Sequence, residues 1–334
     1  MKIRSLAACL ALLAAPSVAS AGDATTTTIK IATLAPSGSA WMKKFEKWKS
    51  NVERRTEGRV KVKFFAGGQQ GDERDAVRKI RAGQLQGAAV TGVGLGLINP
   101  EVRVLDLPFM FKSDEELDFV RSTLAPEFEK KFEEKGFILL AWGDVGWTHL
   151  FSNTEIKQRS DLDKTKMWAW VDDPIVKKFF EKLNVKNSVP LGVPDVLPAL
   201  QTGQINACYG SPLATVALQW HTKVKFMTKT PLSMAVGAFT VSKQAWDTVK
   251  PEDQAILREE AKGLEKALIT TVRKDNKKAL DTMISQGLQV IESPAAMQKD
   301  FEAEAKGVWG ALQGQMFSPD LLKRVQDLAL QKRK

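Results

Sequence analysis

The sequence predicts an α/β protein of about two domains, and three observations carry this prediction. Patterns of short β-strands alternate with amphipathic helical patterns along most of the chain, an order typical of mostly parallel sheets covered by helices. The chain has 334 residues, and domains of roughly 150 residues are common. It is 43% hydrophobic and 26% charged, which is ordinary for a globular protein and excludes a disordered tail, a collagen and a disulfide scaffold.

The first 21 residues differ from the rest of the chain. Lys2 and Arg4 precede an apolar run over residues 6–16, and Ala19-Ser20-Ala21 forms an A-x-A cleavage signal. The apolar run is shorter than the roughly 20 residues that a membrane-spanning helix needs. Residues 1–21 are therefore predicted to be a secretory signal peptide, and the mature protein is expected in the periplasm of a Gram-negative bacterium. Cys208 then remains as the single thiol, so no internal disulfide is expected.

The elements of the first half follow in order. Helical spacing of Trp41, Phe45, Trp48 and Val52 predicts a helix over residues 40–55, and strict alternation predicts a strand over 60–65. The glycines of the run at 92–96 predict a loop, because the run lacks the full nucleotide-binding fingerprint. The other expected elements are strands at 29–34, 88–90, 102–105 and 137–142 and helices at 72–82 and 115–135.

The second half continues the alternation and then changes character. Strands are expected at 147–153, 166–171, 186–190 and 205–209, with helices at 174–183 and 194–202. Pro251 suits a first helical turn, and Glu252 and Asp253 suit the positive end of a helix. A single helix over 251–286 would be about 54 Å long at 1.5 Å per residue, which exceeds one small domain. This helix is expected to brace two lobes.

Enzyme motifs are absent from the sequence. It has no G-x-S-x-G elbow, no Walker loop, no H-E-x-x-H and no cysteine pair with metal-ligand spacing. A Cys/His hydrolase would need Cys208, His149 and His221 to come together in the fold. We therefore predict that the protein is not an enzyme and that it uses no cofactor and no metal.

Four ordered segments carry a more specific signal. They are Val-Leu-Asp-Leu-Pro-Phe-Met-Phe at 104–111, Gly-Arg-Val-Lys-Val at 58–62 followed by the glycine-rich 67–71, Ala-Leu-Gln-Thr-Gly-Gln-Ile-Asn-Ala at 199–207, and Trp246 with Pro251, Glu252 and Gln254. Together they resemble the solute receptors of tripartite ATP-independent periplasmic (TRAP) transporters, the DctP family. The resemblance covers nearly all of the mature chain.

The resemblance implies a two-lobed periplasmic solute-binding protein fold with crossing hinge strands and a long helix bridging both lobes. Lobe I would hold residues 22–145 and about 235–260, lobe II residues 146–234 and about 280–334, with the bridging helix at 251–286. The family closes on one small-molecule solute and delivers it to a small and a large integral membrane TRAP subunit. The protein is expected to be a monomer. Lysines and arginines interleave with glutamates, so nucleic acid is not an expected partner. A receptor of an ATP-driven importer or of a sensory system remains the alternative.

The sequence departs from the family at its carboxylate clamps. The aligned position of the usual strand arginine holds Trp168, and that of a second frequent arginine holds Thr148. The ligand is therefore not expected to be a simple arginine-clamped carboxylate, and an apolar or neutral solute is favoured. A cation held by indole faces and Asp172 is a second possibility. An organic acid is the third, if Arg74 or Arg103 reaches the cleft.

The family placement of the cleft, together with strand ends and turns, predicts the ligand-binding residues. From lobe I they are Trp41, Gln69, Gln70, Glu73 and Thr91, and from lobe II they are Trp147, Trp168, Trp170, Asp172, Tyr209 and Ser211. Asp173 is expected to cap the helix that follows it. If Trp168 lines the cleft, its replacement by alanine should weaken ligand binding much more than it lowers stability.

Overall fold

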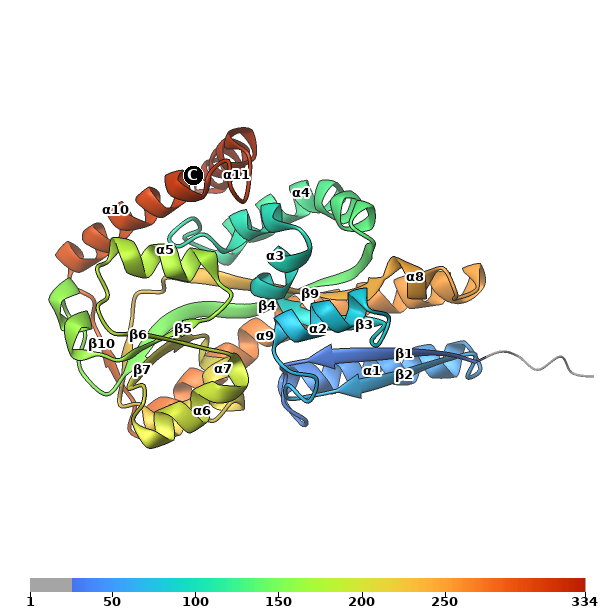
Figure 1. Cartoon of the computed structure of the whole chain (residues 1–334), viewed down its shortest axis with the longest axis horizontal. Helices are drawn as coiled ribbons and strands as arrows, with labels where there is room; N and C mark the ends of the chain where they lie inside the picture. Colours follow the sequence, from blue (N-terminus) through green and yellow to red (C-terminus); the bar gives the residue numbers. More distant parts are fainter. Residues whose placement is uncertain (1–25, 334) are drawn as a thin grey trace, which may run out of the picture.

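The computed structural model describes residues 26–333, so the signal peptide predicted at 1–21 lies outside the described part of the chain. Two α/β lobes share one mixed sheet with the strand order β2-β1-β3-β9-β4-β7-β5-β6 (Figure 1). Strands β4 and β9 pair with each other along their length and connect the lobes, because β9 also pairs with β3 while the end of β4 pairs with β7. The two-lobed α/β fold with crossing strands is confirmed.

Lobe I is built on parallel strands β1, β2 and β3. Local capping fixes its helices, since Ser39 accepts from the backbone of Met42 at the start of α1 and Asp72 accepts from Glu73 at the start of α2. Its elements are β1 Thr27–Thr33, α1 Ala40–Arg55, β2 Val60–Phe65, α2 Glu73–Arg81, β3 Gly87–Thr91, α3 Gly92–Ile98, the 3-10 helix η1 Pro100–Asp106 and α4 Asp114–Glu134.

Lobe II repeats the alternation around β5, β6 and β7, and the remaining elements join or cover the lobes. The elements of lobe II are η2 Arg159–Lys164, β5 Met167–Trp170, α5 Pro174–Lys182, β6 Ser188–Leu191, α6 Val193–Thr202, β7 Ala207–Gly210, α7 Pro212–Ala217, η3 Trp220–Lys223, β8 Phe226–Thr228 and β10 Gln289–Ile291. The others are β4 Phe137–Ser152, β9 Ser233–Ser242, α8 Lys243–Trp246, α9 Pro251–Ser285, α10 Ala295–Leu312 and α11 Pro319–Lys332. Helix α10 packs on α5 and α11 packs on α4, while the predicted lobe boundaries stay a prediction.

Two predicted elements were wrong. The predicted strand at 102–105 is part of η1, because Asn99 caps the segment, Pro100 begins it, and its apolar side chains are buried without a strand partner. The predicted loop at 92–96 is helix α3, whose N-cap Thr91 accepts from the backbone of Val93. A Cβ at Gly92 would lie 1.7 Å from the carboxylate of Asp106, so close packing, not loop flexibility, requires this glycine.

The crossing strand β4 is longer than predicted. The sequence predicted two strands, 137–142 and 147–153, and the structure joins them into one strand of 16 residues. Its pairing with β9 shifts register between Leu139 and Ala141 and again between Asp144 and Gly146. Gly146 has a φ of 124°, which L side chains rarely adopt. These irregularities bend the strand where the lobes meet.

Helix α9 runs along both lobes, as the sequence predicted for 251–286. It has 35 residues, begins at Pro251, and packs against α1 of lobe I, against β4, and against α7 of lobe II. Its buried side chains include Leu257, Leu264, Val272 and Met283. In Figure 1 the orange helix passes behind the sheet from one lobe to the other. It therefore forms a common support for both halves of the cleft.

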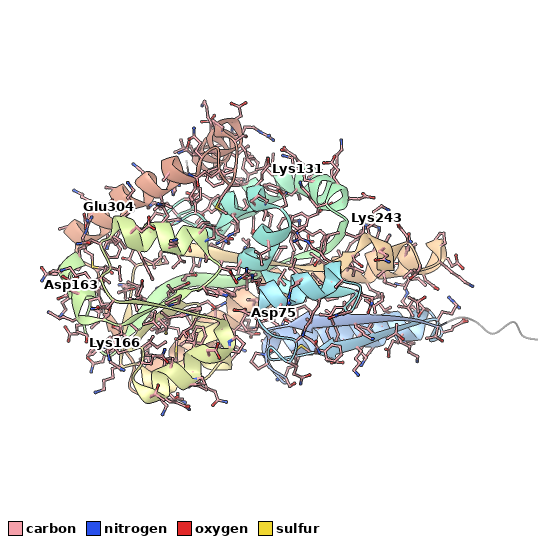
Figure 2. All side chains as sticks on the ribbon, viewed as in Figure 1. Asp75, Lys131, Asp163, Lys166, Lys243 and Glu304 are labelled. Atoms are coloured by element: carbon pink, nitrogen blue, oxygen red, sulfur yellow. The ribbon has the colours of Figure 1, made fainter. Side chains whose placement is uncertain are left out.

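The charged surface is mixed in sign. Figure 2 shows labelled side chains such as Lys131, Lys243, Asp163 and Glu304 at the periphery of the molecule. Several of these form ion pairs, among them Lys131 with Glu101 and Lys243 with Asp247. Ion pairs that are partly or fully exposed to solvent contribute little to stability. No helix among residues 26–333 is both long and apolar enough to cross a membrane.

Gly263 offers a simple test of α9. It is exposed in the helix interior, and a Cβ at this position would meet nothing within 4 Å. Gly263→Ala should raise the free energy of unfolding by about 0.5–1 kcal/mol, because alanine is the better helix former. Urea denaturation checks this. The matched control is Gly203→Ala, which has equal space but a φ of 73° and should destabilise. If both variants changed the free energy of unfolding in the same direction, this explanation would be wrong.

Candidate functional site

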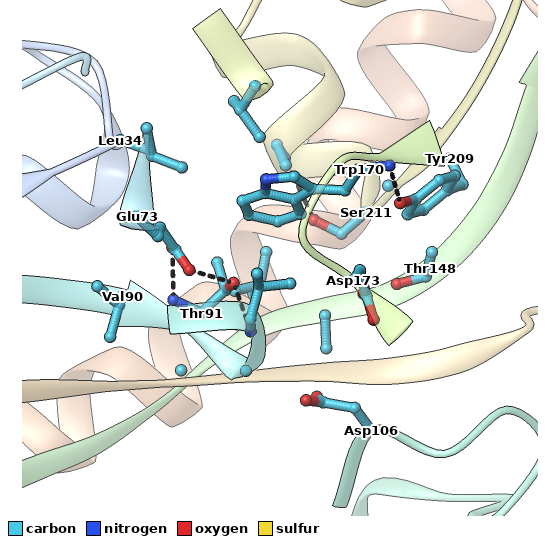
Figure 3. Close-up of a pocket in the computed structure, with 18 of the residues that line it drawn as sticks. Leu34, Glu73, Val90, Thr91, Asp106, Thr148, Trp170, Asp173, Tyr209 and Ser211 are labelled. Carbon is cyan, nitrogen blue, oxygen red and sulfur yellow. Dashed lines mark hydrogen bonds between the residues drawn. The ribbon is translucent and has the colours of Figure 1, made fainter. Parts of the chain in front are cut away.

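A cavity of about 230 Å³ lies between the lobes, beside the crossing strands. Residues from both lobes and from β4 and β9 line it (Figure 3). Seven of the eleven residues proposed from the sequence are in this lining: Trp41, Glu73, Thr91, Trp168, Trp170, Tyr209 and Ser211. They come from α1, α2, β3, β5 and β7 and from the start of α7, so the fold brings distant segments to one place.

The other four proposed residues lie outside the cavity lining. Gln69 is exposed on the glycine-rich turn, and Gln70 accepts a hydrogen bond from Lys79 at 3.0 Å. Trp147 donates its indole N–H to Asp114 at the start of α4, at 2.8 Å. Asp172 accepts from Arg74 of α2 at 3.0 Å, away from the cavity lining. Gln69 and Gln70 lie on the predicted turn and Asp172 follows β5, but Trp147 lies inside β4, and none of the four side chains lines the cavity.

Trp168 is the centre of an aromatic cluster in lobe II. Its ring stacks on Tyr209 with centroids 4.6 Å apart and 15° between planes, and meets Trp220 edge-on at 5.1 Å. Trp170 lies 5.9 Å away in a tilted arrangement. The Trp168 side chain is only 1% exposed and donates to the carbonyl of Leu191 at 3.0 Å. Trp168 is therefore a core residue that also borders the cavity, whereas Trp170 is only half-buried.

The cavity lining contains one cationic side chain among the described residues, Arg103 of η1. Its Nε donates to Asp106 at 2.9 Å, and its Nη2 donates to both oxygens of Asp173 at 3.0 Å. Asp173 also caps α5, as predicted, by accepting from Ile175 at 2.9 Å. Burial raises the pKa of Asp106 to about 6 in spite of the adjacent guanidinium. Arg103 thus reaches the cleft but is already paired with a carboxylate from each lobe.

A second charged network surrounds Asp144, where β4 passes between the lobes. Asp144 of β4 is buried and accepts from Arg121 of α4 at 2.6 Å and from Arg273 of α9 at 2.7 Å. Its backbone carbonyl accepts from the indole of Trp41 at 3.2 Å, which orients that ring at the cavity. Sequence reasoning missed this network, because its members lie far apart in the chain. Thr148, noted only as a replaced arginine, also lines the cavity.

Glu73 braces the wall of the cavity from lobe I. Its carboxylate accepts from the backbone and the hydroxyl of Thr91, at 2.7 and 2.9 Å (Figure 3). It also accepts from the backbone of Gly94 at 2.6 Å. The carboxyl is buried at the start of α3, and this burial raises the pKa of Glu73 to about 7. Its two oxygens accept from Thr91 and Gly94, so Glu73 fixes the cavity wall where β3 ends and α3 begins.

The pKa of Glu73 predicts a pH dependence of stability. Unfolded chains release this proton near the ordinary value of 4.5, while the folded protein keeps it until about pH 7. The folded state then binds the extra proton, so stability falls as pH rises from about 4.5 to 7, by up to about 3 kcal/mol. Asp106, with a pKa of about 6, acts in the same direction.

Urea denaturation between pH 4.5 and 8 measures this dependence. Glu73→Gln has no proton to release and should flatten the fall in unfolding free energy. At pH 4.5 the glutamine should lower stability, because a single carbonyl oxygen cannot serve the donors from both Thr91 and Gly94. The slope, not the absolute value, is the test. Equal slopes for the two proteins would show that Glu73 titrates in its ordinary range.

The hydrolase alternative gains no support. Cys208 is fully buried, burial raises the pKa of its thiol, and neither it nor His149 nor His221 lines the cavity. His149 instead contacts the carbonyl of Thr228 at 2.9 Å, and burial lowers the pKa of this histidine. Over residues 26–333 no cluster of three or more His, Cys, Asp or Glu could hold a metal ion.

Two lobes, crossing strands and an aromatic cavity between them define the class of an interlobe solute-binding protein. Residues 31–315 match the family model DctP, "Bacterial extracellular solute-binding protein, family 7". The chain belongs to this family, which confirms the TRAP-type solute receptor predicted from the four sequence segments.

Relatives agree with this assignment. A "Solute-binding protein" of Verminephrobacter eiseniae is 26% identical over 244 residues, which cover 72% of each chain. The 2,3-diketo-L-gulonate-binding periplasmic protein YiaO of Escherichia coli is 24% identical, over 74% of this chain and 75% of its own. Among solved structures, the sugar acid binding protein DctPAm of Advenella mimigardefordensis, with galactonate, has a TM-score of 0.85 at 18% identity, covering 92% of this chain and 99% of that one.

A TRAP solute-binding protein of Ralstonia eutropha, with (S)-2-acetolactate bound, has a TM-score of 0.85 at 23% identity. The match covers 91% of this chain and 99% of that one. At these identities the structures establish a shared fold. The solute of this chain depends on the residues that line its own cavity.

Proposed function

We propose that this protein is the periplasmic receptor of a TRAP transporter that closes on one small neutral solute with an apolar or aromatic body. It would present that solute to the small and large membrane subunits. Family membership supports the receptor role and an extracytoplasmic location. That the receptor acts as a monomer stays a prediction.

The pairing of Arg103 carries the proposal for the solute class. Arg103 is the one cation in the described lining, and it is shared by Asp106 and Asp173. A carboxylate ligand would place a third negative charge around a single guanidinium. Burying a charge without a free partner costs several kcal/mol, so the cavity disfavours a simple anion. The sequence resemblance aligns Trp168 with the arginine by which family members clamp a carboxylate.

The aromatic wall supplies the favourable term for a neutral solute. Trp170, Tyr209 and the border of Trp168 present ring surface, and burial of apolar area contributes about 25 cal/mol per Å². The hydroxyl of Thr148, and the hydroxyl proton of Ser211, whose oxygen caps α7, can hydrogen-bond a polar group of the solute. Orientation would then come from neutral donors and acceptors, and binding energy from the rings.

A small organic acid is the second candidate, favoured by the neighbours in fold. The proteins of Advenella mimigardefordensis and Ralstonia eutropha were solved with galactonate and (S)-2-acetolactate, both acids. The route to a cation through Asp172 loses its support, because that carboxylate lies outside the lining and is paired with Arg74. Acidic residues still border the cavity, so a cation belongs among the probes.

Native mass spectrometry of protein purified without refolding, with identification of any carried-over solute, tests the proposal directly. Calorimetry with matched probes then separates the classes: phenylacetamide against phenylacetate, galactose against galactonate, and choline as the cation. The neutral member of each pair should bind at least about tenfold more tightly, a difference of about 1.4 kcal/mol. A co-purified carboxylate held at low micromolar affinity would overturn the neutral assignment and leave the receptor role intact.

A further inference from the structure

One carboxylate in lobe I reaches across the mouth of the cleft. Asp72 immediately precedes α2, and its Oδ1 accepts from the backbone of Glu73 at 2.8 Å. Its Oδ2 accepts from the indole of Trp170 at 2.8 Å and from the backbone N–H of Val193 at 3.2 Å. Both of the latter donors belong to lobe II. Asp72 therefore caps its own helix with one oxygen and contacts the opposite lobe with the other.

The contacted backbone is the start of helix α6. The N-cap residue of α6 is Gly192, which has no side chain to accept from the first turn. The first N–H groups of a helix lack partners within the helix and favour a negative charge. Asp72 supplies that acceptor from the other lobe, so α6 receives its cap only when the lobes are together.

The requirement for glycine at position 192 comes from this contact and not from the backbone angles of Gly192. Its φ of −74° and ψ of 158° are extended values that any residue adopts. A Cβ at this position would lie 2.7 Å from Oδ2 of Asp72. An added methyl group would thus displace the carboxylate from both of its lobe II donors, and only while the cleft is closed.

We propose that Asp72 is a positioning residue for solute capture, which holds the cleft closed by capping α6 across the lobes, and that Gly192 is the glycine this contact requires. Trp170 couples the contact to the solute, because the same indole lines the cavity and donates to Asp72. The inference deepens the proposed function and rests on it. Arg74 of α2 and Asp172 of lobe II form a second contact between the lobes, but the Arg74 side chain is 67% exposed, and solvent-screened pairs are weak.

Lobe separation is measured by double electron–electron resonance between nitroxides at Arg78→Cys in α2 and Lys177→Cys in α5, both exposed positions. Cys208 is fully buried and stays unlabelled. The protein is used as purified without refolding, and native mass spectrometry of the same sample gives the fraction that carries a solute. The reference protein should show a closed population. Gly192→Ala should reduce the ratio of closed to open protein about tenfold and lower solute retention in parallel.

Two variants separate this role from general destabilisation. Asp72→Ser keeps a good N-cap for α2 but is too short to reach α6, so it should open the cleft like Gly192→Ala. In the Asp72→Ser background, Gly192→Ala should have no further effect, because both changes remove one contact. Gly263→Ala, a glycine with free space around it, is the neutral control.

An unchanged distance distribution in Gly192→Ala would overturn the proposal. Additive effects of Gly192→Ala and Asp72→Ser would do the same, and so would a reference protein found only in an open state. The readout is the distance between the lobes, whatever the chemistry of the solute. A carboxylate found in the cavity would therefore refute the neutral assignment without touching this result.

Discussion

Arg103→Met should lower the free energy of unfolding by about 3–5 kcal/mol, because it leaves two buried carboxylates without their shared cation. Arg103 is 3% exposed, Asp106 9% and Asp173 6%. Methionine fills much of the same volume, so the loss would report charge and not a cavity. Urea denaturation at pH 7.5, where both carboxyls are ionised in the unfolded chain, gives the value.

The same variant should also abolish solute capture. Arg103 and Asp106 belong to lobe I, whereas Asp173 begins α5 of lobe II, so the guanidinium bridges the cleft. Without it, closure would bring two like charges together in a site of low dielectric. Calorimetry with phenylacetamide should therefore show no binding even where the variant is folded.

The control is the neutralised triad, R103M/D106N/D173N. Asparagine at 173 still caps α5, and asparagine at 106 can still accept from the backbone of Val236. Replacing a buried ion triad by neutral groups is often tolerated, so this variant should recover most of the lost stability. A loss below about 1 kcal/mol in Arg103→Met alone would show that the carboxyls are protonated or solvated in the folded protein.

Local pattern was enough to place most elements. Helix α1 matches its predicted bounds because its apolar positions recur at helical spacing and Ser39 caps it. Helix α9 differs from 251–286 by a single residue, since Pro251 opens it and no later proline interrupts it. The misassigned 102–105 and 92–96 segments are held by tertiary packing, in which Gly92 lies against the side chain of Asp106 and Gly96 against that of Arg103. Secondary-structure propensity is a local property, so it cannot predict contacts between residues that are distant in the sequence.

The sequence predicted which strand ends and turns surround the cavity, but it did not predict the ion pairs in the cavity wall. Trp170, Tyr209 and Ser211, chosen from strand ends and turns, line the cavity, and their contact with the solute stays a prediction. The bond from Arg103 to Asp173 spans 70 residues of sequence, and no spacing rule links the two. Gln69, in the correct turn, is simply exposed, because side-chain direction in a glycine-rich turn depends on the backbone angles of each residue.

Trp168→Ala should destabilise the protein by about 3–5 kcal/mol, the range for large-to-small changes at buried aromatics. The sequence alone suggested the reverse balance, a large loss of affinity with a small loss of stability. At 1% exposure, stacked on Tyr209 and packed against Trp220, the ring is a central part of the lobe II core. Its loss also frees the carbonyl of Leu191 from its donor.

Trp170→Phe is the comparison that separates packing from solute contact. Phenylalanine keeps an aromatic face toward the cavity but loses the indole N–H that Asp72 accepts. It should cost less than about 1.5 kcal/mol of stability while weakening phenylacetamide binding several-fold, because it removes one contact of the closed form. Urea denaturation and calorimetry on Trp168→Ala and Trp170→Phe together show how much each ring contributes to stability and how much to solute affinity. If Trp168→Ala keeps full stability and loses only affinity, its ring faces the solute in solution and the core assignment fails.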